Sequence, residues 1–316
     1  MTPRASRWRF WGTASTEWRF AARMLQGLAL GAASGPSTAA LTGARTHRRP
    51  AQGGAGVHDG LGGRSRRAVS AGGLGLGPVL AGLLAEYAPA RDVLPFAVEI
   101  ALLVPAAGVI AAFPASRPGA GGRPRRPALP AAARTVFAAG GTSAFLAFAV
   151  TGLFLSLAPT CVATLSGSAN LLLGGASVAL MLLSSALAQL AGHGRPARAL
   201  ELLGLPLLAT GLVGLALAGG LSSLALLLAA TVIAGVGHGL ALLGGLTAVH
   251  LAAPADRRAG VLSGFYVIVC LGVGAPVIGV GLLATVTGPL GAVQSFACAV
   301  AVLCLMALFI RTRVRA

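Results

Sequence analysis

Charged residues are scarce in this sequence, and lysine is absent altogether. Charged types make up 10% of the 316 residues, whereas apolar types make up 56%. A soluble domain usually carries about a quarter charged residues, and it needs polar surface to cover its apolar core. The shortage of charge therefore excludes an ordinary water-soluble domain and favours a chain whose solvent is the lipid bilayer.

The sequence also lacks the residue patterns on which most enzymes depend. There is no phosphate-binding P-loop, which excludes ATP as an energy source. The alternating glycines of 235–239 lie inside an apolar run and not after a strand, which argues against a dinucleotide site. Because no paired polar residues stand out at one depth, we expect neither an enzyme nor a bound cofactor.

Cysteine is rare, and its spacing is uninformative. The four cysteines show no Cys-x-x-Cys pair and all lie inside apolar runs, which predicts small buried hydrophobes. We therefore expect neither a disulfide nor a metal site. They are Cys161, Cys270, Cys298 and Cys304.

The net charge of +17 comes entirely from arginine. Such a charge can indicate a nucleic-acid partner, but these arginines mostly stand in short clusters between long apolar runs. That distribution is typical of topology signals in membrane proteins. It excludes nucleic acid and makes the lipid bilayer the expected partner.

Nine apolar segments approach the about 20 residues that a membrane-spanning helix needs. Their apolar runs are continuous, unlike the alternating pattern of transmembrane strands, and leucine and alanine favour helix. The sequence therefore predicts an all-α, polytopic transmembrane bundle of about nine helices. The segments are 21–42, 68–88, 93–113, 135–158, 171–191, 199–219, 224–248, 261–286 and 291–310.

Arginine is concentrated in every second connection between these segments, and only Arg91 lies in the alternate ones. Since arginine stays preferentially on the cytoplasmic side, this alternation predicts a multi-pass protein of the inner or plasma membrane with a cytoplasmic C-terminus. The connecting arginines are Arg45, Arg48, Arg49, Arg64, Arg66, Arg67, Arg117, Arg123, Arg125, Arg126, Arg134, Arg195, Arg198, Arg257, Arg258, Arg311, Arg313 and Arg315.

The domain organisation follows from these segments. Residues 21–114 hold three helices with a polar loop at 43–67, and residues 135–310 hold six. A proline- and arginine-rich central loop, 115–134, separates the two parts, and 311–316 form a tail. The segment 1–20 carries four arginines on the side predicted to lie outside. We therefore expect that it is irregular, through a missing N-terminal partner or a reading-frame error that also explains 43–67.

Two motifs point to a family. The first segment opens with Arg23, followed by Gln26 and Gly27, and resembles the R-x-x-Q-G motif in the fourth helix of the major facilitator superfamily of secondary transporters. The second segment resembles the G-x-x-x-G-P-x-x-G-G motif of that family's fifth helix, which is associated with its drug/proton antiporter branch. The matching residues are Gly73, Gly77, Pro78 and Gly82, with Ala81 in place of a glycine.

The resemblance implies that the nine segments correspond to the family's fourth to twelfth helices. The first three helices, with an acidic residue that such antiporters tend to carry, are then missing. Gly192, Arg195 and Arg198 resemble a degenerate copy of the family's G-R-R cytoplasmic loop motif.

Several residues are candidates for coupling or substrate binding, each with a plainer alternative. Arg23 can serve proton coupling or gating, or its side chain can extend to the interface beside Glu17. The Gly73, Gly77 and Pro78 element can seal one face of a transporter, or it can simply pack helices. Glu99 can bind a proton or cationic substrate, or lie at the outer interface.

His238 lies in the middle of its segment and can relay protons, or it can be a neutral side chain hydrogen-bonded within the bundle. Three further titratable residues lie near segment ends and are interpreted as interface residues. Four polar residues can line a pore. The expected interface residues are His250, Glu201 and Asp256, and the possible pore-lining residues are Gln189, Gln294, Asn170 and Tyr266.

The sequence therefore predicts a secondary transporter that exports small amphipathic molecules, with protons as coupling ion. Substrate would bind near the midplane between two helical halves that rock alternately. The alternative is a truncated, non-transporting fragment or a membrane assembly partner. The substrate and the direction of transport are left open.

Overall fold

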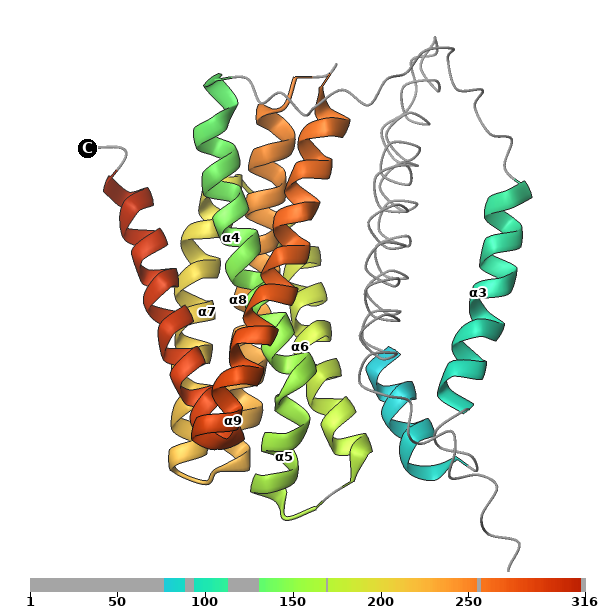
Figure 1. Cartoon of the computed structure of the whole chain (residues 1–316). Helices are drawn as coiled ribbons and strands as arrows, with labels where there is room; N and C mark the ends of the chain where they lie inside the picture. The colour runs from blue at the N-terminus through green and yellow to red at the C-terminus, as the bar shows by residue number, and fades with distance from the viewer. Residues whose placement is uncertain (1–76, 89–93, 113–130, 169, 255–256, 314–316) are drawn as a thin grey trace, which may run out of the picture. The chain divides into compact units, whose positions relative to one another are not determined.

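The computed structural model describes residues 77–88, 94–112, 131–168, 170–254 and 257–313 (Figure 1). These residues form α-helices, and no strand is found among them. The chain divides into two units, 1–53 and 54–316, and all described residues belong to the second. The predicted first segment and the start of the second lie outside the described residues, so the count of nine helices stays a prediction.

The helices follow the predicted segments closely. A helix at 77–87 and α3 (Leu94–Ala112) come first. The remaining helices are α4 (Ala131–Ser156), α5 (Ala158–Ser166), α6 (Leu171–Gly192), α7 (Ala197–Gly220), α8 (Leu224–Ala252) and α9 (Arg258–Arg313). Helix α4 begins inside the predicted central loop, because alanines at 131–133 extend the helix toward Pro130.

Two local features depart from the predicted segments. The predicted segment 135–158 spans the junction of α4 and α5, where Leu157 precedes a new helix with Pro159 in its first turn, a position that proline favours. Helix α9 consists of two helices that meet at Gly288, whose φ of 75° and ψ of 166° suit glycine alone. The two parts of α9 correspond to the predicted segments 261–286 and 291–310.

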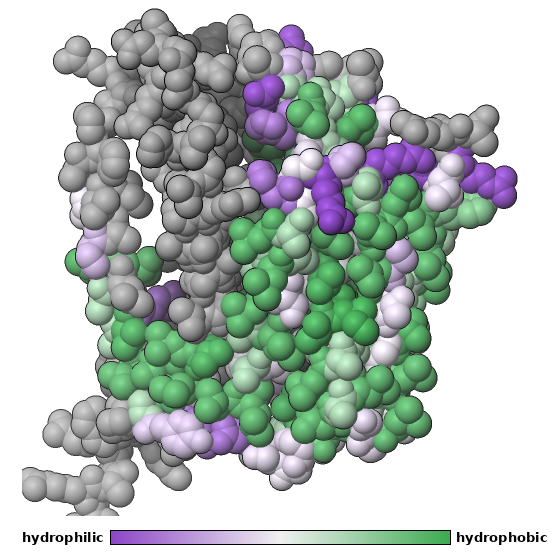
Figure 2. Space-filling model, turned by 180° about the vertical axis from the view of Figure 1, so that it is seen from behind, coloured by the Kyte–Doolittle hydropathy of each residue, from purple (hydrophilic) through white to green (hydrophobic). Residues whose placement is uncertain are grey.

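Among the described residues, five helices are long and apolar enough to cross a membrane: α4, α6, α7, α8 and α9. Large apolar side chains also cover the outside of the bundle, with Val286 84% exposed and Leu187 65% exposed. Figure 2 shows hydrophobic residues spread over the visible flank and hydrophilic residues gathered toward one end. Apolar surface on this scale is a liability in water, so these are the helices of a membrane-embedded protein.

Helix α8 lies against α4, α6 and α7 and forms the centre of the bundle. Lipid is as apolar as leucine, so helices in it associate through close packing and not through the hydrophobic effect. Small residues provide that packing here. A β-carbon at Gly140 would lie 2.8 Å from the carbonyl oxygen of Gly245, and one at Gly245 would lie 2.6 Å from that of Gly140. The backbones of α4 and α8 therefore touch, and neither glycine tolerates a side chain without a shift.

The three arginine-bearing connections of the described bundle lie at one end. They are the α6–α7 turn, the α8–α9 connection and the C-terminal end of α9 (Figure 1). We call this the arginine end and define it by Arg195, Arg198, Arg258, Arg311 and Arg313. The Arg198 guanidinium donates a hydrogen bond to the carbonyl oxygen of Arg311 at 3.3 Å, which ties two of these connections together.

Candidate functional site

A buried hydrogen-bond network surrounds His238 in the middle of α8, and the side chain of His238 is only 4% exposed. Its Nδ1 lies 2.7 Å from the Ser185 hydroxyl on α6, and its Nε2 lies 3.0 Å from the Thr151 hydroxyl on α4. The amide of Gln189, one turn farther along α6, donates to Ser185 Oγ at 3.2 Å. The network thus joins three helices through one imidazole ring.

One arrangement of hydrogens satisfies this whole network with a neutral ring. The Thr151 hydroxyl donates to the carbonyl oxygen of Ala147 at 3.4 Å, so it accepts a hydrogen bond from His238 Nε2–H. Ser185 accepts from Gln189 and donates to His238 Nδ1. Hydroxyl groups rotate freely and both donate and accept. The structure therefore matches the hydrogen-bonded alternative for His238, and a proton relay stays a prediction.

The glycines beside His238 set the distances in this network. A β-carbon at Gly235 would lie 2.5 Å from the carbonyl oxygen of Met181, and one at Gly239 would overlap the carbonyl of Ser185. Both glycines therefore hold the backbone of α6 against α8 on either side of His238. The sequence shows these glycines, but only the packed helices show that they bring Ser185 within hydrogen-bonding distance of the imidazole.

A second cluster joins the helix at 77–87 to the N-terminus of α6. We call it the glycine seam and define it by Pro78, Gly82, Glu86, Leu171 and Gly175. A β-carbon at Gly82 would lie 2.9 Å from the carbonyl oxygen of Leu171, and one at Gly175 would lie 2.5 Å from that of Pro78. The backbones of the two helices are therefore in direct contact.

Polar side chains close the glycine seam. The Glu86 carboxylate accepts a hydrogen bond from the backbone N–H of Leu171 at 2.9 Å, at the start of α6. The Asn170 side-chain amide donates to the Tyr87 hydroxyl at 3.1 Å, and its oxygen accepts from the N–H of Leu172 at 2.8 Å. A carboxylate at a helix N-terminus is favourable because the helix dipole is positive there. Asn170 is thus the N-cap of α6. The sequence had suggested that it could line a pore.

The predicted motif residues are only partly involved in this seam. Gly82 and Pro78 make the contact, whereas a β-carbon at Gly77 would meet nothing within 4 Å. Four other residues of the predicted motifs, Arg23, Gln26, Gly27 and Gly73, lie outside the described residues. The partner Gly175 was not singled out from the sequence. No sequence signal marks it, because glycine is abundant throughout the segments.

An ion pair lies near the arginine end, where the sequence suggested an interface residue. Glu201 on α7 is only 7% exposed and pairs with Arg311 on α9, which also donates to the carbonyl oxygen of Ala139 on α4. Glu201 Oε1 has no hydrogen-bond partner among the described residues. Glu201 therefore has a buried partner that the sequence did not indicate, because Arg311 lies on a helix 110 positions later in the chain, and its place at the membrane interface stays a prediction.

The remaining candidate residues from the sequence differ in their exposure and in their contacts. Glu99 is exposed on α3. Gln294 donates to the carbonyl oxygen of Ala216 at 3.2 Å, and Tyr266 packs edge-on against Phe265. Asp256 lies outside the described residues. Of the loop-motif residues Gly192 is buried, Arg198 is half-buried and Arg195 is exposed.

The prediction that all four cysteines are buried is wrong for two of them. Cys161 and Cys304 are buried, but Cys270 and Cys298 lie on the outer surface of α9. An apolar segment in lipid needs no buried face, because thiol and aliphatic side chains are equally acceptable against acyl chains. Burial therefore does not follow from apolar sequence context in a membrane helix.

Comparisons of the chain with known proteins do not identify a family for it. No family model matches the chain, and neither a curated protein nor a solved structure shows significant similarity to it. The resemblance to the major facilitator superfamily therefore rests on the motifs alone, and the candidate site rests on the geometry of the His238 network and the glycine seam.

Proposed function

We propose that this protein is a secondary transporter of small amphipathic molecules that couples transport to protons, with its arginine end in the cytoplasm. The observation that carries the proposal is a titratable side chain held between three membrane-type helices by two hydroxyl groups. Ionisable residues inside membrane segments are expensive and generally mark ion or substrate pathways. The arginine end supports a cytoplasmic orientation of the C-terminus, because arginine is generally retained on the cytoplasmic side.

Proton binding at His238 would change the contacts between helices. The protonated imidazole donates from both nitrogens, so Ser185 can no longer donate to Nδ1. Ser185 already accepts from Gln189, and its hydroxyl hydrogen must then turn to another acceptor. Protonation thus rearranges the link between α6 and α8 while Thr151 keeps its bond to Nε2. This gives the proton a direct effect on helix packing.

Helix α6 connects this rearrangement to the glycine seam. Its N-terminal end touches the helix at 77–87, and its C-terminal half carries Ser185 and Gln189. A transporter with two rocking halves needs a contact that closes one side while the other opens. A seam made of backbone contacts and a few polar bonds suits that task, since it forms or separates as a unit.

The test is uptake by the full chain in proteoliposomes with an imposed pH gradient, using ethidium as a fluorescent amphipathic cation. We expect accumulation that follows the gradient and disappears with an uncoupler. His238→Gln should lower gradient-driven accumulation at least tenfold, because the variant cannot take up the proton. Thr210→Val is the matched control, since Thr210 is exposed on α7 and its hydroxyl donates to the carbonyl oxygen of Pro206 on the same helix.

Two outcomes would contradict the proposal. Correctly inserted, helical wild-type protein without any gradient-dependent uptake would favour the alternative, a fragment or membrane assembly partner. Wild-type-like coupling in His238→Gln would leave transport possible but remove His238 from it.

A further inference from the structure

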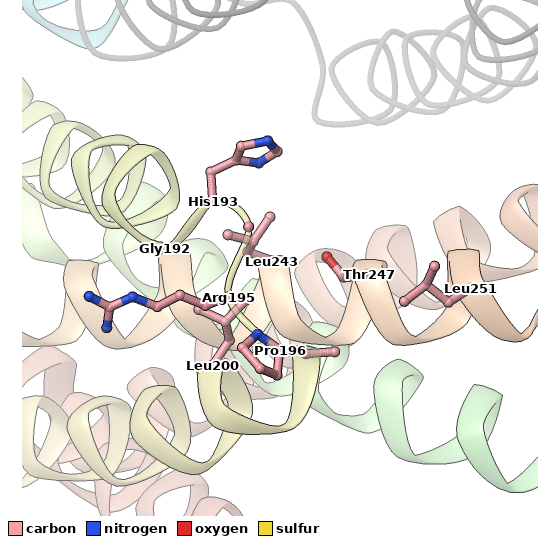
Figure 3. A pocket seen from close by; sticks show the side chains of 10 residues that line it. Gly192, His193, Arg195, Pro196, Leu200, Leu243, Thr247 and Leu251 are labelled. Carbon is pink, nitrogen blue, oxygen red and sulfur yellow. The ribbon is translucent and has the colours of Figure 1, made fainter. Parts of the chain in front are cut away.

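We propose that a cavity at the arginine end is a binding site for the headgroup of an anionic phospholipid. The cavity has a volume of 380 Å³ and lies between the α6–α7 turn, the first turn of α7 and the last turns of α8 (Figure 3). Ligand pockets start at about 300 Å³, so the space suits a headgroup and not a whole lipid. Its lining residues are Gly192, His193, Gly194, Arg195, Pro196, Ala197, Leu200, Leu243, Thr247 and Leu251.

The polar side chains of the lining are a guanidinium, an imidazole and a hydroxyl, each able to donate a hydrogen bond, and none is a carboxylate. His193 and Arg195 are exposed, extend from the turn in different directions, and make no side-chain hydrogen bond or ion pair with the described residues (Figure 3). The hydroxyl of Thr247 is likewise without a partner among the described residues. This differs from Thr210 and Thr231, which bond to carbonyl groups four residues earlier. The cavity therefore favours an anion with several acceptor oxygens.

The start of α7 adds a further attraction for an anion. Pro196 is the N-cap of α7, and its side chain makes no capping hydrogen bond. The first backbone N–H groups of a helix have no acceptor within the helix, and the dipole is positive there. Ala197 lines the cavity, so this uncapped helix end borders it.

The apolar lining identifies the anion as part of an amphiphile. Leu200 on α7 and Leu243 and Leu251 on α8 supply the large apolar side chains of the lining, and Leu251 is 74% exposed at the end of α8. A free phosphate ion gains nothing from leucine, whereas the glycerol and first methylenes of a phospholipid do. Basic pockets between membrane helices at the cytoplasmic side are suited to anionic headgroups. The proposal requires only that the bundle lies in a membrane and is independent of transport.

The experiment is a binding titration of the purified full chain in detergent, read by native mass spectrometry, with phosphatidylglycerol and phosphatidylcholine as the two probes. We expect a clear preference for phosphatidylglycerol. Arg195→Gln should weaken phosphatidylglycerol binding about fivefold, which corresponds to the usual contribution of one basic residue near an anionic membrane. Arg195→Lys should retain most of the affinity, because it keeps the charge.

The matched control is Arg134→Gln, which removes an exposed arginine from the first turns of α4, outside the cavity lining. Equal binding of the two lipids by the wild type would overturn the proposal, and so would equal losses in Arg134→Gln and Arg195→Gln. Displacement of phosphatidylglycerol by millimolar inorganic phosphate would identify a free-anion site and reject the lipid. Arg195 is exposed and bonds through its backbone N–H to Gly192, so its replacement leaves the fold intact.

Discussion

The bundle contains two buried polar clusters that differ in chemistry and in position along the helices. The His238 network lies between α4, α6 and α8 and consists of groups that can be neutral, each able to donate or accept. The Glu201–Arg311 pair joins α7 to α9 near the arginine end and consists of two opposite charges. The first can gain a proton and rearrange its hydrogen bonds, whereas the second already consists of two charges that neutralise each other. We infer that the first serves function and the second serves structure.

The largest effect on stability is expected from breaking the ion pair. Glu201→Leu should lower the free energy of unfolding by about 3 kcal/mol, because removing one partner leaves the other charge buried. Arg311 is 12% exposed in its side chain, so little water reaches it. Denaturant unfolding of the purified chain, followed by circular dichroism, measures the change.

The double variant Glu201→Leu with Arg311→Met is the control. It removes both charges and should regain more than half of the loss, since apolar replacements of a buried pair are often neutral. A double variant as unstable as Glu201→Leu would show that shape, and not charge, holds α7 and α9 together.

The next largest effect is expected at the glycine that holds α6 against α8. Gly239→Ala should destabilise the chain by about 2 kcal/mol, because the added methyl group overlaps the carbonyl of Ser185 and forces α6 outward. Gly279→Ala on α9 is the matched control, since a β-carbon there meets nothing within 4 Å. The difference between the two melting temperatures measures the contact. Equal values would mean that α6 moves away from α8 at no cost.

Sequence patterns predict much of this fold because an apolar run in lipid has few alternatives to a helix. Helix α6 was predicted at 171–191 and spans Leu171–Gly192, and α8 was predicted at 224–248 and spans Leu224–Ala252. The short helix α5 was not predicted. In sequence, a proline that starts a new helix cannot be distinguished from a proline that kinks a single membrane span. The helix at 77–87 is the described part of the segment predicted at 68–88.

Which residues meet across helices could not be predicted. His238 was a candidate on its own, but Ser185 and Thr151 are ordinary residues of α6 and α4 whose roles depend on how three helices are rotated. Helix rotation is set by the contacts of small residues, and 46 glycines leave too many possible pairings. The burial of Glu201 was missed for the same reason, because Arg311 is distant in sequence.

The His238 network is expected to contribute less to stability than the ion pair. His238→Leu should cost about 1 kcal/mol, since hydrogen bonds between membrane helices average about 0.6 kcal/mol and the orphaned hydroxyls can bond to nearby carbonyl groups. The same variant should abolish gradient-driven uptake in proteoliposomes. His238→Leu should thus lose little stability and all coupling. Glu201→Leu, by contrast, should mainly lose stability, because the ion pair has a structural role. A loss as large as that of Glu201→Leu would make His238 a structural residue.

An equally small effect is expected at the glycine seam, where the Glu86 carboxylate accepts a hydrogen bond from the first N–H of α6 beside the Asn170 cap. Glu86→Ala removes the acceptor for the N–H of Leu171, and a helix cap contributes about 1 kcal/mol. Hydrogen exchange of the first-turn amides of α6 should therefore accelerate about fivefold, while the amides around Ser185 stay protected. Tyr87→Phe is the control, because it removes only the bond from Asn170 and leaves the carboxylate in place. If Glu86→Ala instead exposed the amides near Ser185, the two ends of α6 would be coupled. The seam and the His238 network would then be parts of one mechanical unit.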